Sequence, residues 1–171
     1  SARFHREVGN CVCHPAPAPL NQQGAGTAFI VGSIFTGNKA DGGDGGAVNV
    51  TGASETFIDD TAFLGNRANN FGGGLHHSGS GLELADATFK GNISDFNGGG
   101  FYFEDLDAVL DSCEFEGNWS GFHGGGGFSN GGSPQISSCT FDENVAVGRG
   151  GALVFSLCAP SVQKSVFARN H

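Results

Sequence analysis

An internal repeat, with a period close to 26, constrains this chain more than any other feature of its sequence. Six phenylalanines recur at intervals of 28, 26, 26, 26 and 26, and an asparagine follows each one three positions later. The phenylalanines are Phe35, Phe63, Phe89, Phe115, Phe141 and Phe167, and the asparagines are Asn38, Asn66, Asn92, Asn118, Asn144 and Asn170. An aliphatic residue precedes each phenylalanine by five positions, and a glycine pair follows each of the first five asparagines. Self-similarity at such a period indicates a solenoid.

The segments between the glycine-rich turns favour strands over helices. A helical repeat needs apolar residues at i, i+3, i+4 and i+7, and none of the six units has that pattern. Short runs alternate with a period of two instead, as in Val48-x-Val50 and Phe101-x-Phe103. Three short strands and three turns use about the length of one unit, so the sequence predicts an all-β parallel β-helix with three faces and five to six coils.

Stacking of equivalent residues explains the repeated positions. Successive coils of such a solenoid lie about 4.8 Å apart, the spacing of neighbouring strands. We therefore expect the phenylalanine rings to stack inside the coil and the asparagine amides to form a ladder at a turn. The glycine pairs are expected at turns that need a positive φ and no side chain.

The motifs of these units resemble a known family. An F-x-x-N motif at residues 35–38 is followed by Gly-Gly-Ala-Val at residues 45–48, and the same order recurs at residues 141–144 and 150–153. This pattern is similar to the repeat of the chlamydial polymorphic outer membrane proteins. The resemblance implies a right-handed parallel β-helix of the pectin-lyase-like kind, on a secreted or surface protein.

The repeat also suggests how the chain is divided. Residues 1–27 do not fit it and are expected to form an N-terminal cap or a lead-in segment, whereas residues 28–171 form the solenoid. The chain stops at Asn170-His171, just after an F-x-x-N turn begins another coil, so we expect the solenoid to continue beyond residue 171 in a longer protein. An open coil end exposes unpaired strand edges, and residues 153–171 are therefore expected to contact more polypeptide.

Charge and hydropathy exclude several classes of function. The net charge is −9, from 17 acidic and 8 basic residues. Proteins that bind nucleic acids need a basic face, so no nucleic-acid partner is expected. The apolar runs are only a handful of residues long, which predicts no transmembrane segment.

One pair of residues is a candidate for acid–base catalysis. Tyr102 follows His76 by one repeat length, and the two are expected in one outward column, flanked by Asn49 and Ser129. Polysaccharide lyases and epimerases need a base, an acid and a positive group that neutralises the substrate carboxylate. No Lys or Arg joins this column, so we expect surface side chains there and no catalytic residues. His77 alternates to the inward side and is expected to be a packing residue.

No cofactor is expected, and the case for a metal is weak. Asp41 and Asp44 stand in a glycine-rich turn that loosely resembles calcium-binding turns. Such motifs repeat the aspartate at one position over several turns, whereas only the first coil has two here. The expected structure is a plain loop without metal.

The sequence is compatible with two covalent modifications, a disulfide bond and N-glycosylation. Cys113 and Cys139 occupy the same position in adjacent coils, so they are expected to form either a disulfide or two stacked buried thiols. Asn49 begins an Asn-Val-Thr sequon and is expected to point outward, where it is available for glycosylation.

The sequence therefore predicts a non-catalytic structural or interaction module of a secreted or cell-surface protein. It would serve as a spacer, an adhesin or a subunit of an extracellular assembly. Its expected partners are other protein chains or extracellular polysaccharide. The alternative is a β-helix that binds carbohydrate, or one that acts as a polysaccharide lyase or epimerase.

Overall fold

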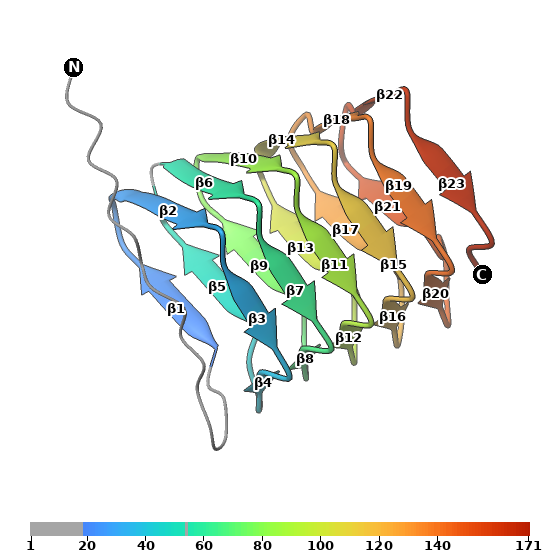
Figure 1. Cartoon of the computed structure of the whole chain (residues 1–171), viewed down its shortest axis with the longest axis horizontal. Coiled ribbons are helices and arrows are strands. Elements are labelled where there is room, and N and C mark those ends of the chain that lie inside the picture. The colour runs from blue at the N-terminus through green and yellow to red at the C-terminus, as the bar shows by residue number, and fades with distance from the viewer. Residues whose placement is uncertain (1–18, 54) are drawn as a thin grey trace.

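A computed structural model describes residues 19–53 and 55–171. These residues form 23 strands and no helix. Accordingly, the described part of the chain offers no helical segment suited to span a bilayer. Figure 1 shows the coils side by side along the long axis, running from β1–β4 to β21–β23. Every strand pairs in parallel with its counterpart in the next coil, which defines a parallel β-helix.

The strands form four parallel sheets, which we label A to D. Sheet A contains β1 (Leu20–Gln23), β5 (Val48–Thr51), β9 (Leu75–Ser78), β13 (Phe101–Glu104), β17 (Gly127–Asn130) and β21 (Leu153–Ser156). Sheet B contains β2 (Thr27–Val31), β6 (Glu55–Asp59), β10 (Gly81–Ala85), β14 (Asp107–Asp111), β18 (Gln135–Ser137) and β22 (Ser161–Gln163). Sheet C contains β3 (Ile34–Thr36), β7 (Ala62–Leu64), β11 (Thr88–Lys90), β15 (Glu114–Glu116), β19 (Thr140–Asp142) and β23 (Val166–Ala168). Sheet D contains β4 (Lys39–Ala40), β8 (Arg67–Ala68), β12 (Ile93–Ser94), β16 (Trp119–Ser120) and β20 (Val145–Ala146).

The prediction of an all-β parallel solenoid with one repeat unit per coil is confirmed, but the number of faces differs. Sheet D was not expected, because its strands are only two residues long and too short to show alternation. Strand β1 pairs with β5 and lies within the segment 1–27 that was expected to be a cap or lead-in. The expectation for residues 1–18 falls outside the described residues.

An asparagine ladder runs along the corner between sheets C and D. From Asn66 to Asn170, each amide oxygen accepts two hydrogen bonds from the asparagine of the preceding coil, as Asn92 Oδ1 does from the backbone N and Nδ2 of Asn66 at 3.0 and 2.9 Å. Asn92 Nδ2 donates in turn to Asn118 Oδ1 and to the carbonyl of Phe63. The same pattern runs from Asn38 to Asn170. Amides that are buried and fully paired in this way hold neighbouring coils in register.

The six phenylalanines stack inside the coil next to this ladder. Successive ring centroids are 4.3–5.3 Å apart and the rings lie within 17° of parallel. Four of these side chains have no exposed area: Phe63, Phe89, Phe115 and Phe141. Aliphatic side chains of sheet B fill the space beside them, among them Ile58, Leu84 and Leu110. The interior is therefore a set of continuous columns.

The turns that enter sheet A require glycine. Gly72 has a φ of 66°, and a Cβ at this position would collide with the carbonyl oxygen of Leu75. Gly45, Gly98, Gly124 and Gly150 occupy equivalent turns with positive φ and a matching collision. A side chain would be strained there by both its φ and its contacts.

Apolar side chains are exposed in the last coil. Val162, Val166 and Phe167 are 41%, 56% and 47% exposed, whereas Phe141 one coil earlier is fully buried. The expectation that residues 153–171 contact more polypeptide stays a prediction.

Candidate functional site

The structure brings His76 and Tyr102 together on the outer face of sheet A. They pair in register on β9 and β13, and their rings lie face to face at 5.6 Å and 6°. Both are buried, at 5% and 7% exposure. Asn49 completes this end of the column, because its Oδ1 lies 2.9 Å from His76 Nδ1. An amide oxygen only accepts, so the neutral His76 ring donates from Nδ1.

The fifth coil departs from the expected register. Phe101 pairs with Gly127 and Tyr102 with Phe128, so Phe128 joins the outward column and Ser129 points inward with 1% exposure. The expectation that Ser129 flanks His76 and Tyr102 is therefore wrong. The physical reason is the ring of Phe101, which fills the space where a Cβ of Gly127 would lie.

We call six of the aromatic rings on this face the outer aromatic strip; a seventh ring, that of His123, borders it at 4.0 Å from Phe122 and 6.5 Å from Phe128. Three lie on sheet A and three on the turns that lead from sheet D into sheet A; they are His76, Tyr102, Phe128, Phe71, Phe96 and Phe122. Phe71 stacks on Tyr102 at 4.6 Å, and Tyr102 stacks on Phe128 at 5.4 Å. Phe96 meets Phe71 edge-on at 6.0 Å. The sheet supplies a buried inner layer, and the turns place further rings outside it.

Phe96 and Phe122 are the exposed members of the strip, at 52% each. Each follows a fully buried serine, Ser94 or Ser120, by two residues. Each serine Oγ accepts the N–H of its own phenylalanine at 3.2 Å, and its single O–H lies within hydrogen-bond distance of two carbonyl oxygens of the turns. The Phe122 N–H also donates to the Phe96 carbonyl at 3.0 Å. These contacts fix the backbone beneath both rings.

Burial and acidic neighbours set the protonation of the inner layer. Burial lowers the pKa of His76, although Asp44 and Glu104 oppose this effect. Burial also raises the pKa of Tyr102, and Glu104, Asp44 and Asp105 add to it. At neutral pH both rings are therefore uncharged and lie in a negative field.

His77 lies on the opposite side of the same strand, inside the coil, with no exposed area. Its Nε2 lies 2.9 Å from Thr56 Oγ1, while its Nδ1 has no hydrogen-bond partner. Burial, and secondarily the charge of His76, lowers the pKa of His77 to about 4. This neutral core histidine contributes nothing to the outer surface.

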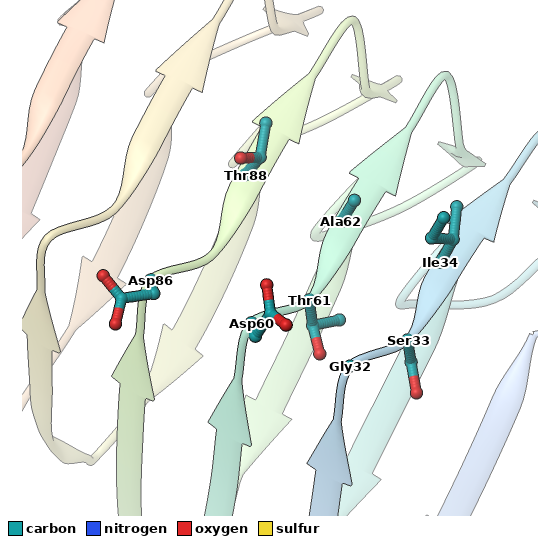
Figure 2. A pocket seen from close by; sticks show the side chains of 8 residues that line it. All are labelled: Gly32, Ser33, Ile34, Asp60, Thr61, Ala62, Asp86 and Thr88. Carbon is teal, nitrogen blue, oxygen red and sulfur yellow. The ribbon is translucent and has the colours of Figure 1, made fainter. Parts of the chain in front are cut away.

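A shallow groove of about 270 Å³ lies at the bends between sheets B and C (Figure 2). Asp60 and Asp86 occupy equivalent bends in neighbouring coils, both with positive φ, and Ser33 and Thr88 lie nearby. No Lys, Arg or His lines the groove. It therefore lacks the positive group that an acidic sugar substrate needs.

The two aspartates considered for calcium are engaged in other contacts. Asp41 is paired with Lys39 at 2.5 Å, and Asp44 Oδ1 accepts the N–H of Phe71 at 3.2 Å. Across residues 19–53 and 55–171, no three His, Cys, Asp or Glu side chains are grouped so that they could hold a metal ion.

The two stacked cysteines are free thiols in the structure. The Cys113 N–H points at Cys139 Sγ at 3.4 Å, and both residues are buried. Hydrogen bonding to Cys139, together with burial, raises the pKa of Cys113, so this thiol stays protonated.

Asn49 is half-buried, and glycosylation at its Nδ2 stays a prediction.

Sequence reasoning missed the two exposed rings of the strip. Phe96 and Phe122 lie outside the column of six phenylalanines, so the main repeat does not single them out. The Ser-x-Phe spacing at 94–96 recurs one repeat later at 120–122, but it also occurs at 33–35 and 165–167, where the phenylalanine belongs to the main repeat, so this spacing alone does not single out the two rings. Phe71, the third ring in these turns, lies one position later in its coil than Phe96 and Phe122 do in theirs, so it does not follow the Ser-x-Phe spacing.

Comparison with known proteins supports the fold alone. A family model described as "Right handed beta helix region" matches residues 20–171. No curated protein and no solved structure matches the chain. The narrower resemblance to the chlamydial repeat stays an expectation from the motifs. Because the family model covers most of the chain, this protein belongs to the right-handed β-helix family.

Proposed function

We propose that the chain is a non-catalytic structural and interaction module of a secreted or cell-surface protein. In this role a stiff β-helix holds the outer aromatic strip toward another protein. The asparagine ladder and the phenylalanine stack support the structural half, since they join each described coil to the next.

The exposed rings of Phe96 and Phe122 carry the interaction half of the proposal. A half-exposed phenylalanine gains little from folding, yet two of them stand on backbone that buried serines hold in place. Large exposed apolar groups on a rigid support are typical of binding surfaces. Aromatic side chains are enriched in the buried centres of protein interfaces.

A carbohydrate-binding module is the second candidate, because exposed aromatic faces also pack against sugar rings. A lyase or epimerase has less support. The outward column of β5, β9, β13, β17 and β21 contains Asn49, His76, Tyr102, Phe128 and Val154. None of these side chains is a permanent cation that could neutralise a uronate carboxylate.

Two experiments test the proposed function. Antibodies against the folded chain should label intact cells of the source organism or its culture medium; labelling only after permeabilisation would refute the extracellular role.

A photo-crosslinking residue at Phe122 should attach the chain to a protein partner, whereas the same group at Val109 should not. Val109 is a suitable control because it is 39% exposed on sheet B. Equal crosslinking at both positions would refute the role of the strip.

The catalytic alternative has its own assay. Lyase activity on uronate polymers releases unsaturated sugars that absorb ultraviolet light. We expect no such release from the intact chain. Release that is abolished by His76→Gln would replace the proposed function with an enzymatic one.

A further inference from the structure

We propose that the outer aromatic strip and the turns beside it bind a second copy of this chain, in an antiparallel pair with two-fold symmetry. This pairing rests on the proposed function, because it makes the strip the contact surface. It depends on one row of residues, which we call the turn column. Each member precedes a positive-φ glycine of the turns that enter sheet A, and the members are Asp44, Phe71, Asn97, His123 and Arg149.

The backbone spaces the turn column evenly. Each turn glycine donates its N–H to the column residue of the next coil, as Gly72 does to Asn97 at 3.1 Å and Gly98 does to His123 at 2.9 Å. Successive members are therefore about 4.8 Å apart, the spacing of neighbouring strands. Asn97 stands at the centre, with two members on either side. A two-fold axis that crosses the column there at right angles exchanges its two ends.

Three of the five side chains are anchored on the next coil. Asp44 Oδ1 accepts the N–H of Phe71 at 3.2 Å. Asn97 Oδ1 accepts that of His123 at 3.1 Å, and His123 Nδ1 accepts that of Arg149 at 3.0 Å. Side chains that are already ordered lose little entropy when they bind, which favours association.

Opposite charges stand at the two ends of the turn column. Asp44 and Arg149 are four strand spacings or about 19 Å apart, too far to neutralise each other within one chain in physiological salt. Among residues 19–53 and 55–171 Arg149 makes no ion pair. In the antiparallel pair Arg149 of each copy faces Asp44 of the other, so two ion pairs form across the interface. A parallel pair would instead place like charges together, which opposes association.

The net charge of the chain does not prevent this pairing. Sheet D and the turns that lead from it into sheet A carry three bases and three acids, namely Lys39, Arg67, Arg149, Asp41, Asp44 and Asp95. The charges of these elements therefore sum to zero. The remaining acids that give the chain its charge of −9 lie on other elements, and salt screens repulsion between them over such distances.

The exposed rings supply the apolar contact of the pair. The axis places Phe96 of one copy against Phe96 of the other, because Phe96 lies in the same coil as the axis. Phe122 then lies against the turn at residues 69–71 of the second copy, and His123, which packs on Phe122 at 4.0 Å, lies opposite Phe71. Burial of these half-exposed rings drives association. The patch is small, so we expect a dissociation constant on the order of 10 µM.

Sedimentation equilibrium of the whole chain, from about 1 µM to about 500 µM, tests the pairing. We expect a monomer–dimer equilibrium, and a chain that stays monomeric throughout would overturn the inference. Phe96→Ser/Phe122→Ser should raise the dissociation constant at least about tenfold, because symmetry counts each lost ring twice. The matched control Val109→Ser, on sheet B, should leave the constant unchanged. Equal dimerisation of the wild type and the double variant would refute the strip as the contact surface.

A charge exchange tests the antiparallel direction. Arg149→Asp and Asp44→Lys each create two like-charge contacts, so each variant alone should dimerise about tenfold more weakly than the wild type. A mixture of the two variants should pair again, because both contacts then join opposite charges. This recovery would also show that both variants fold. Single variants that dimerise as tightly as the wild type, or a mixture that stays monomeric, would refute the antiparallel pair.

Lys164→Asp is the matched control for these charge variants. It changes the net charge by the same amount as Arg149→Asp, but Lys164 lies exposed at a bend between sheets B and C. Asp60 and Asp86 already occupy equivalent bends with positive φ, so aspartate fits this backbone. The variant should dimerise like the wild type; equal weakening by Lys164→Asp and Arg149→Asp would show that net charge, and not the turn column, controls association.

Crosslinking separates the pair from the proposed function. A photo-crosslinking residue at Phe122 should join purified chains to each other, with the link at residues 69–71 of the second copy. Links that map to another face of the chain would refute the pairing geometry. If this residue captures a different protein in the native setting while the purified chain stays monomeric, the strip is still an interaction surface, but the second copy is refuted as its partner.

Discussion

Acid should destabilise this protein through His77, and the structure sets the size of the effect. The ring is fully buried, its Nδ1 has no partner, and its pKa falls from 6.5 to about 4. In the unfolded chain the same ring takes up a proton at its ordinary pKa. Below pH 6.5 the unfolded state therefore binds more protons than the folded state, and stability falls as the pH falls.

The magnitude follows from the difference between the two pKa values. One pKa unit corresponds to about 1.4 kcal/mol, so the loss between pH 6.5 and pH 4 is about 3 kcal/mol. Most of the loss occurs above pH 4, and the slope contributed by His77 vanishes once the folded ring is also protonated. The pKa of His76 is lowered as well, which adds to the loss in the same direction.

Urea unfolding between about pH 4 and pH 7.5 measures this loss directly. The control variant is His77→Gln, which keeps a polar group near Thr56 Oγ1 but does not titrate. The difference in unfolding free energy between wild type and variant should change by about 3 kcal/mol across the range. Carboxylates titrate in both proteins, so they cancel in the difference. Parallel pH profiles of the two proteins would refute the buried, neutral state of His77.

Three further predictions concern the interior and the metal question. Phe89→Ala and Phe115→Ala should each lower the unfolding free energy by about 3–5 kcal/mol in urea melts, as other interior phenylalanine truncations do; losses under about 1 kcal/mol would contradict the stacked interior. Asn92→Ala removes four hydrogen bonds and should cost roughly 3 kcal/mol or more, whereas Asn49→Ala on the outer face should cost less. EDTA should leave the melting temperature unchanged, and a drop that calcium restores would show that the turn at residues 41–44 holds a metal.

The sequence could predict the interior because every coil repeats it. Phe89, Asn92 and Leu84 stand at the same offsets in their own coil as their counterparts elsewhere, and parallel stacking places like on like. The pairing of each asparagine amide follows from this register. A fold made of equivalent layers is therefore well determined by the spacing of its residues.

The parts that could not be predicted are those that vary from coil to coil. The run of four glycines at residues 124–127 allowed two registers, and only the packing of the Phe101 ring against Gly127 distinguishes them. Sheet D was missed because two-residue strands carry no periodic signal. The exposed members of the strip, Phe96 and Phe122, were missed because they lie in turns, where the sequence alone does not show which side chains stack.

Native-state hydrogen exchange tests the central claim most directly, namely that rigid coils hold the outer aromatic strip in place. The backbone N–H groups of Asn66, Asn92 and Asn118 donate to the amide of the next coil, and those of Phe96 and Phe122 donate to carbonyls of the preceding coil. We predict that all five exchange only through global unfolding, so that each reports the same free energy as urea melts. Fast exchange at Phe96 and Phe122, with the three asparagines still protected, would show that the strip sits on loose turns and would contradict the account.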